Sequence, residues 1–258
     1  YGGVEMLPAI PVPNFWRAPT DNDRANLMPM RYGQWKIASQ YLSHKDFRTG
    51  AIHTPQVTTK EDCVEVTCTY VLPSKPATEV FLIYMIYQDG TVQVKLQYNV
   101  IPELADMPEF GVLFKLDADF HNFTWYGRGP ADTYADRNHG SKLGVYTTTA
   151  QENMAAYLVP QECGNKTDVR WAEVTDYRGR GLRFEGDNMN VSVLPYTPHE
   201  IENARHPYEL PEIHYTVVRC SLAQMGIAGD NTWGAQTHPE YLLKPEGTME
   251  FTFSFKGI

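Results

Sequence analysis

The chain has 258 residues, which is longer than the usual single domain of roughly 100–150 residues. Its 22 basic and 31 acidic residues give a net charge of −9, which argues against the basic surface that nucleic-acid binding needs. Hydrophobic residues make up 42% of the chain, enough for a core and too many for a disordered protein. The longest apolar run, 80–87, is far shorter than the roughly 20 residues of a membrane-spanning helix. We therefore expect neither nucleic acid nor a membrane as a partner.

The first periodic segment is a helix predicted over 31–42, where Trp35, Ala38 and Leu42 fall on one face. The residues before it, 1–29, include five prolines. We expect them to belong to the same domain, as an N-terminal arm that could pack separately.

Three consecutive strands are predicted next. Residues 64–72 alternate between apolar and polar side chains, the period of a half-buried strand. Residues 80–87 are continuously apolar, as in a strand that is covered on both faces. Asp89 and Gly90 then supply the positive φ angles of a tight turn, and 92–100 alternates again on the way back.

Strand-like runs dominate the rest of the chain. They occupy 111–120, 182–196 and 213–225, and the final segment 248–255 alternates methionine and phenylalanine with polar residues. A short helix is predicted over 197–204, because threonine, proline and glutamate stand where a capping box requires them. No repeat of fixed period is present. The sequence thus predicts an all-β protein, a single large antiparallel sandwich spanning 1–258.

Several familiar site patterns fail in this sequence. The segment starting at His199 resembles a zinc-protease motif, but Asn203 replaces the second histidine. The segment starting at Gly127 resembles a dinucleotide-binding loop, but Asp132 replaces the third glycine and no parallel βαβ unit surrounds it. Four scattered cysteines form no CxxC pair, so neither a disulfide framework nor a metal centre is expected.

Several segments that we expect to be loops instead mix aromatic side chains with charged ones, a combination typical of sugar recognition. The apolar face of a pyranose packs on an aromatic ring while planar polar groups bind its hydroxyls. The alternative is that these charges fix long loops to the sandwich. The segments are 14–23, 125–130, 134–137, 160–171, 194–200, 229–234 and 238–241.

Together, and in this order, the motifs resemble the C-terminal domain of the large β-galactosidases of glycoside hydrolase family two. In heterodimeric members the same region forms the small subunit. The resemblance covers the chain from Asn14 to nearly its last residue. It implies an antiparallel supersandwich that is similar to the galactose mutarotases. One departure is Asp132, where many relatives carry glutamate.

The resemblance also implies that this chain is not catalytic alone. Retaining glycosidases need two carboxyl groups about 5–5.5 Å apart, and in this family both belong to glutamates of an upstream TIM-barrel domain. The expected partners are that barrel domain or large subunit and a β-galactoside, and enzymes of this family are often oligomeric. No cofactor or metal is expected in this chain, since the parent enzymes use Mg and Na in other domains. The compartment stays open, with a bacterial cytoplasm or periplasm as the expectation.

Trp233 matches the family's tryptophan that reaches into the neighbouring barrel and contacts substrate. Gly229 and Gly234 flank it and allow a sharp loop, and the indole offers a large face with one N–H donor. Asp230 and Asn231 are expected to shape this loop through hydrogen bonds to its backbone. On the residues alone, the alternative is a core tryptophan that covers one end of the sandwich.

The remaining candidates are weaker. Glu162, Asn165 and Arg170 are placed in one loop of mixed charge that could line a concave face. His199 is the candidate acid of an alternative function, a free-standing aldose mutarotase, with Glu162 or Glu200 as base. A further alternative is a non-catalytic carbohydrate-binding domain. Two charged networks are expected to fix loops: Arg17, Asp21 and Asp23 in one, and Arg128, Asp136 and Arg137 in the other.

Overall fold

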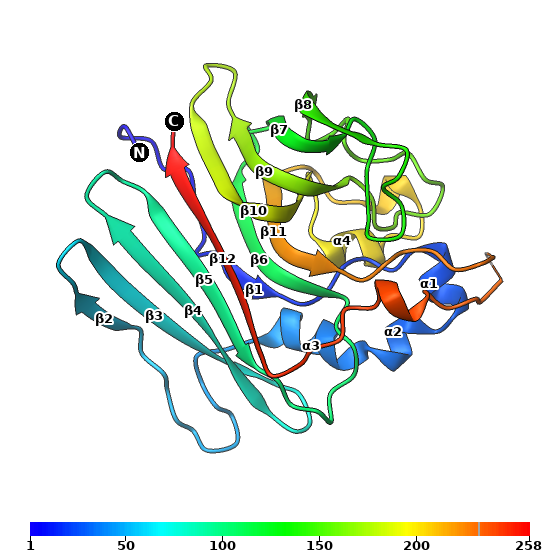
Figure 1. Ribbon diagram of the computed structural model, residues 1–258, viewed down its shortest axis with the longest axis horizontal. Coiled ribbons are helices and arrows are strands. Elements are labelled where there is room, and N and C mark those ends of the chain that lie inside the picture. Colours follow the sequence, from blue (N-terminus) through cyan, green and yellow to red (C-terminus); the bar gives the residue numbers. More distant parts are fainter. Residues whose placement is uncertain (232) are drawn as a thin grey trace.

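The computed structural model describes residues 1–231 and 233–258, and within them strands dominate (Figure 1). The strands are β1 (Val12–Asn14), β2 (Gln56–Thr59), β3 (Cys63–Leu72), β4 (Thr78–Tyr87), β5 (Val92–Asn99), β6 (Glu109–Asp117), β7 (Asn122–Gly129), β8 (Lys142–Thr149), β9 (Asn165–Thr175), β10 (Gly181–Leu194), β11 (Tyr215–Gln224) and β12 (Thr248–Gly257). The helices are α1 (Asp21–Ala25), α2 (Met28–Arg31), α3 (Gly33–Tyr41) and α4 (Pro198–Asn203), with 3₁₀ turns η1 (Pro207–Glu209) and η2 (Pro239–Tyr241).

All pairings between these strands are antiparallel, and the sheet forks at β10. On one side β10 pairs with β9 along almost its whole length. On the other side its first half, 182–186, pairs with β12, and its second half, 190–194, pairs with β11. The register of β9 against β10 shifts between Glu185 and Val191, and Asn188 has a positive φ of 51°. Such an irregularity bends a strand, so the two branches diverge into separate layers.

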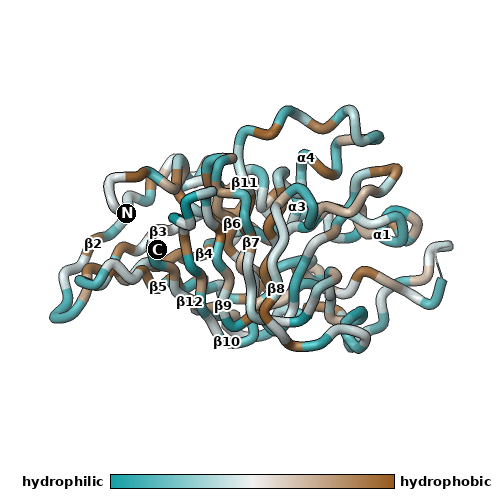
Figure 2. Tube along the Cα trace, turned by 90° about the horizontal axis from the view of Figure 1, so that it is seen from above, coloured by the Kyte–Doolittle hydropathy of each residue, from teal (hydrophilic) through white to brown (hydrophobic). Residues whose placement is uncertain are grey.

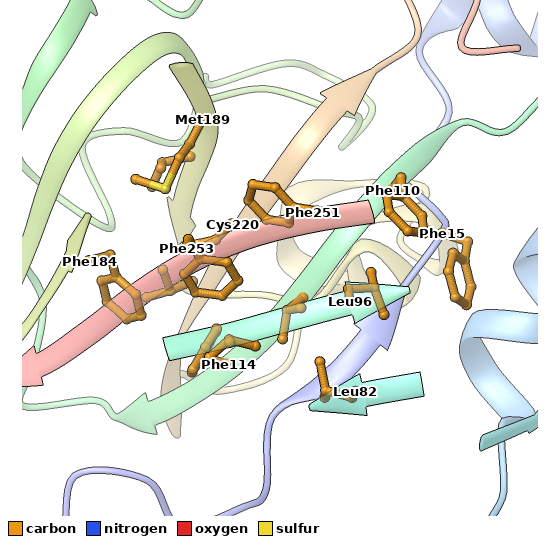
Figure 3. Close-up of a cluster of buried hydrophobic side chains, with 14 of the residues drawn as sticks. Phe15, Leu82, Leu96, Phe110, Phe114, Phe184, Met189, Cys220, Phe251 and Phe253 are labelled. Atoms are coloured by element: carbon orange, nitrogen blue, oxygen red, sulfur yellow. The ribbon is translucent and has the colours of Figure 1, made fainter. Parts of the chain in front are cut away.

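One branch runs β12–β5–β4–β3–β2, and the other runs β11–β6–β1. The ring of Phe114 on β6 lies 5.5 Å from that of Phe255 on β12, although β6 and β12 are not hydrogen-bonded neighbours. Phe114 also makes an edge contact with Phe184 of β10, at 5.1 Å (Figure 3). These contacts show that the two branches face each other across one aromatic core, as in a β-sandwich.

The predicted elements are confirmed within a few residues at their ends. The alternating run that starts at Val64 is β3, the apolar run is β4, and the return strand β5 buries Val94, Leu96 and Tyr98. The C-terminal phenylalanines lie on the buried face of β12. The predicted short helix is α4, and Thr197 and Glu200 form its capping box.

Two expectations about chain organisation are corrected. The aromatic and charged segment 125–130 is not a loop, since Trp125 to Gly129 lie in β7 and alternate between buried and half-exposed positions. Likewise the segment 160–171 is not one loop, because β9 begins at Asn165. Glycine and charged residues interrupt the apolar alternation in these two segments, so the strand period was not visible in the sequence. The structure pairs β7 with β8 and β9, and β9 with β7 and β10, so hydrogen bonds to two neighbours stabilise each strand.

The N-terminal arm is part of the sandwich. β1 pairs with β6, and Phe15 and Trp16 are fully buried in the main core with Met28 of α2. None of the described helices is long and apolar enough to cross a membrane. All four cysteines are free thiols and buried.

The loops and helices gather at one end of the molecule. In Figure 1 α1, α2 and α4 lie at the end opposite β2 and both chain termini. Figure 2, turned by 90°, shows the same division. This end holds most of the segments that the sequence singled out for sugar recognition.

Candidate functional site

Trp233 stands on an exposed loop after β11, and its side chain is 90% exposed. The Asn231 side chain shapes the loop, since its Oδ1 accepts hydrogen bonds from the backbone N–H of Trp233 at 2.8 Å and of Ala235 at 3.4 Å. Gly234 has a φ of +112°, and a Cβ at that position would lie 3.3 Å from the carbonyl oxygen of Ala25 in α1. The tryptophan is therefore outside the core, on a turn that glycine makes possible.

A buried arginine supports the start of this loop. Arg17 Nη2 donates to the carbonyl oxygen of Gly226 at 3.0 Å, and its Nη1 contacts Asp23 Oδ2 at 2.5 Å. Asp23 also closes the capping box of α1 with Thr20. Burial disfavours the charge on Arg17, but Asp23 outweighs that cost, and the pKa of the guanidinium is raised. The predicted network of the N-terminal arm is confirmed for Arg17 and Asp23, whereas Asp21 binds Arg24 and Gln161.

A second carboxylate holds the same stretch from the other side. Asp136 Oδ2 accepts a hydrogen bond from the backbone N–H of Ala228 at 2.8 Å, and Thr237 Oγ1 donates to the Gly226 carbonyl at 3.1 Å. The expected lock among Arg128, Asp136 and Arg137 is wrong, because the two arginines pair with Asp168 and Asp132 instead.

The exposed part of the loop carries one polar clasp. Asp230 Oδ1 lies 2.7 Å from His238 Nε2, and Glu240 Oε1 lies 3.7 Å from the other ring nitrogen. The hydrogen bond and charge of Asp230 raise the pKa of His238. The clasp joins the two ends of the loop that presents Trp233.

A buried cluster of charged side chains lies beneath the loops, with Arg219 at its centre. Its Nη1 contacts Glu109 Oε2, and its Nη2 contacts Glu162 Oε1, each at 2.6 Å. All three side chains are essentially inaccessible to solvent. Burial lowers the pKa of Arg219, but the two carboxylates outweigh it, so the net shift is upward. Burial raises the pKa of Glu162.

Neutral side chains complete the cluster around Glu109. Its Oε2 accepts from Asn14 Nδ2 at 2.9 Å, while its Oε1 accepts from Gln224 Nε2 at 3.1 Å and from the Ser221 hydroxyl. Gln224 also donates to Asn165 Oδ1 at 3.3 Å. Glu109 and Glu162 are thus two carboxylates closed by one arginine, with no access for a sugar between them. We interpret this cluster as a structural junction of β1, β6, β9 and β11.

The structure separates the remaining candidates. Glu162 and Asn165 belong to the buried cluster, whereas Arg170 lies in the middle of β9, where it bonds the Asp168 carbonyl and lies over the Tyr126 ring. His199 lies on α4, and burial lowers its pKa. These residues therefore do not form one concave site with Trp233. Among the described residues, no group of three metal-binding side chains is brought together.

Glu109 and Arg219 were missed by sequence reasoning. Glu109 is the first residue of β6 and Arg219 lies in the middle of β11, and both are buried in strands whose residues are mostly buried. A charged residue in such a run is almost always paired when buried. The two opposite charges in these strands were the available signal.

The fold and the loop define an all-β domain that presents a surface tryptophan, and the family follows from comparison with known proteins. The family model described as "Beta galactosidase small chain" matches residues 1–255. A β-galactosidase small subunit from Latilactobacillus sakei is 32% identical over 97% of this chain and 86% of its own length. The chain belongs to the β-galactosidase small chain family.

Longer relatives match over a part of their length. β-Galactosidases from Priestia megaterium and Halalkalibacterium halodurans are 38% and 36% identical over all of this chain. The chain spans only about a quarter of either relative, 24% and 25%. Among solved structures, a galactose mutarotase-like protein from Lactobacillus casei aligns with 80% of this chain and 74% of its own, at 10% identity and a TM-score of 0.38.

Proposed function

We propose that this chain is the non-catalytic portion of a β-galactosidase, which completes the substrate pocket by presenting Trp233 to it. The single observation that carries the proposal is the exposure of Trp233 on a braced loop in a member of this family. Tryptophan is enriched among the side chains that anchor binding partners, so an indole held outward by specific contacts indicates a ligand or partner.

The proposed role of Trp233 follows from its chemistry. A galactose ring has one apolar face of C–H groups that can stack on the indole, and the indole N–H can donate to a hydroxyl. The contacts of Arg17, Asp136 and Asn231 fix the loop before substrate arrives, so little conformational entropy is lost on binding.

The catalytic carboxylates are proposed to lie outside this chain, in the TIM-barrel portion of the enzyme. A retaining glycosidase needs two carboxyl groups that both reach the sugar. Glu109 and Glu162, the two carboxylates that the fold brings onto Arg219, are buried and neutralised by it. The barrel, on the same chain or on a large subunit, is thus the proposed partner, and a β-galactoside is the proposed substrate.

The test is the Trp233→Ala substitution in the assembled β-galactosidase. We expect kcat/KM for a chromogenic β-galactoside to fall roughly tenfold to a hundredfold, as for loss of one aromatic contact to the substrate. Trp233→Tyr should retain part of the activity because it keeps a ring. Tyr177→Ala is the matched control, since Tyr177 is also an exposed aromatic residue but lies in the β9–β10 turn. Unchanged kcat/KM in Trp233→Ala would refute the role.

The structure does not favour the alternative of a free-standing mutarotase. Its candidate bases are already engaged: Glu162 binds Arg219, and Glu200 caps α4 and accepts from the Tyr215 hydroxyl. A general base must be free to take a proton from the sugar.

A further inference from the structure

An apolar groove opens on the surface beside α4. Its volume is about 390 Å³, and it lies between the segment 151–160 and the residues that precede and follow α4. Its lining includes Met154, Leu158, Pro195, Leu210 and Ile213, and Gln151 is the one lining residue with an amide or charged side chain.

The lining fits a protein partner better than a sugar. A carbohydrate site needs several planar polar groups to bind hydroxyls, and apart from the hydroxyls of Tyr157 and Tyr196 this groove offers a single amide. Leu158 is 88% exposed at its rim. An exposed leucine beside an apolar groove is typical of the centre of a protein–protein interface.

The groove and the Trp233 loop both adjoin α1. Arg24 Nη2 donates to the carbonyl of Pro160, a groove residue, at 3.1 Å. A Cβ at Gly234, next to Trp233, would lie 3.3 Å from the carbonyl oxygen of Ala25 in the same helix. Figure 1 shows α1 and α4 at this end of the molecule, away from both termini. A body that covers Trp233 can therefore extend over α1 to the groove.

We infer that the groove docks an apolar segment of the remaining portion of the same β-galactosidase. The inference rests on the proposed function, because it takes Trp233 to face that portion. The chain spans about a quarter of its longer relatives, so a body about three times its size is available to cover this face. The apolar lining indicates that the docking segment carries leucine, valine or aromatic side chains rather than charge.

The test is thiol labelling in the assembled β-galactosidase. Leu158→Cys places a reactive thiol at the groove, and the four native cysteines of this chain are buried. Val57→Cys and Tyr177→Cys are the controls, since both residues are exposed and lie on β2 and in the β9–β10 turn. Maleimide labelling is followed at each site by mass spectrometry of its peptide. We expect Leu158→Cys to react at least tenfold more slowly than both controls, although Leu158 is the more exposed residue in this chain.

A photo-crosslinking residue at position 158 then identifies what covers the groove. Crosslinks to peptides outside 1–258 support the inference. Crosslinks to a second copy of residues 1–258, or labelling at 158 as fast as at the controls, would overturn it. Activity of Trp233→Ala is measured separately, so loss of activity with an uncovered groove would leave the proposed function intact and refute only the docking surface.

Discussion

Arg17 and Gly226 are 209 residues apart in the chain, and the guanidinium Nη2 donates to the glycine carbonyl at 3.0 Å. The same arginine is paired with Asp23, which caps α1. One buried side chain thus fixes both the helix beside the Trp233 loop and the point where that loop begins. The position of Trp233 therefore depends on the buried residues Arg17 and Asp23.

This relationship predicts that Gly226→Ala disturbs the loop. A Cβ at Gly226 would lie 2.5 Å from Asp136 Oδ2 and 2.9 Å from Thr237 Cγ2, so the loop or both side chains must move. We expect a loss of about 1–3 kcal/mol in the free energy of unfolding. If Trp233 contacts substrate, displacement of the loop should also lower kcat/KM roughly tenfold.

Gly140→Ala is the matched control, because a Cβ there meets no atom within 4 Å. Urea unfolding and steady-state kinetics of the assembled enzyme measure the two effects. If Gly226→Ala retains full activity while its stability falls, the loop position does not control catalysis.

Much of the sandwich could be predicted because apolar and polar side chains alternate along its strands. β3, β5 and β12 alternate apolar and polar residues because one face of each covers the core, and that alternation is visible in the sequence. β9 was misread as part of a loop because it packs between two other strands and carries Arg170 and other polar residues on its half-exposed face.

The buried cluster could not be predicted from local pattern. Glu109, Glu162 and Arg219 come from three separate segments, and only the tertiary fold brings their charges together. Glu162 looked like a ligand-binding residue because it stands in a polar, aromatic segment. Trp233 was identified by its motif, and nothing in its local pattern distinguishes an exposed indole from a buried one.

The cluster predicts a large effect for Arg219→Met. The substitution leaves Glu109 and Glu162 buried without their cation, so we expect the free energy of unfolding to fall by about 3–5 kcal/mol. Urea unfolding of the chain measures this. Arg183→Met is the control, because Arg183 pairs with two glutamates at the surface and should cost at most about 1 kcal/mol. Equal effects of the two substitutions would contradict the importance of the buried cluster.

The clasp between Asp230 and His238 makes a prediction about pH. Asp230 raises the pKa of His238, so the charged pair is present while Asp230 is ionised and His238 is protonated, and it is lost as the pH rises through the pKa of His238 in the folded protein. In Asp230→Asn we expect a lower pKa for His238, measured by an NMR titration of its ring protons. Glu240→Gln should have the smaller effect, since that carboxylate is 3.7 Å away. An unchanged titration in Asp230→Asn would show that the clasp does not form in solution.

Lys166 provides a second test of buried charge. Its Nζ donates to the Pro130 carbonyl at 3.0 Å and lies 4.7 Å from the Trp125 ring centroid, and burial lowers its pKa to about 8. Below pH 8 the lysine is charged in both the folded and unfolded states, and the folded protein bears the cost of burying that charge. Between pH 8 and about 10.5 the unfolded chain holds the proton more tightly, so stability rises with pH.

Relative to Lys166→Met, we therefore expect the wild-type chain to gain about 2–3 kcal/mol in unfolding free energy between pH 7 and pH 10. The lost bond to Pro130 shifts the variant equally at both pH values, so the change with pH isolates the charge. Lys95→Met removes a partly exposed lysine from β5 and controls for loss of surface charge. Urea unfolding of all three proteins at both pH values measures the difference, and parallel behaviour of wild type and Lys166→Met would mean that water reaches Lys166 in the folded state.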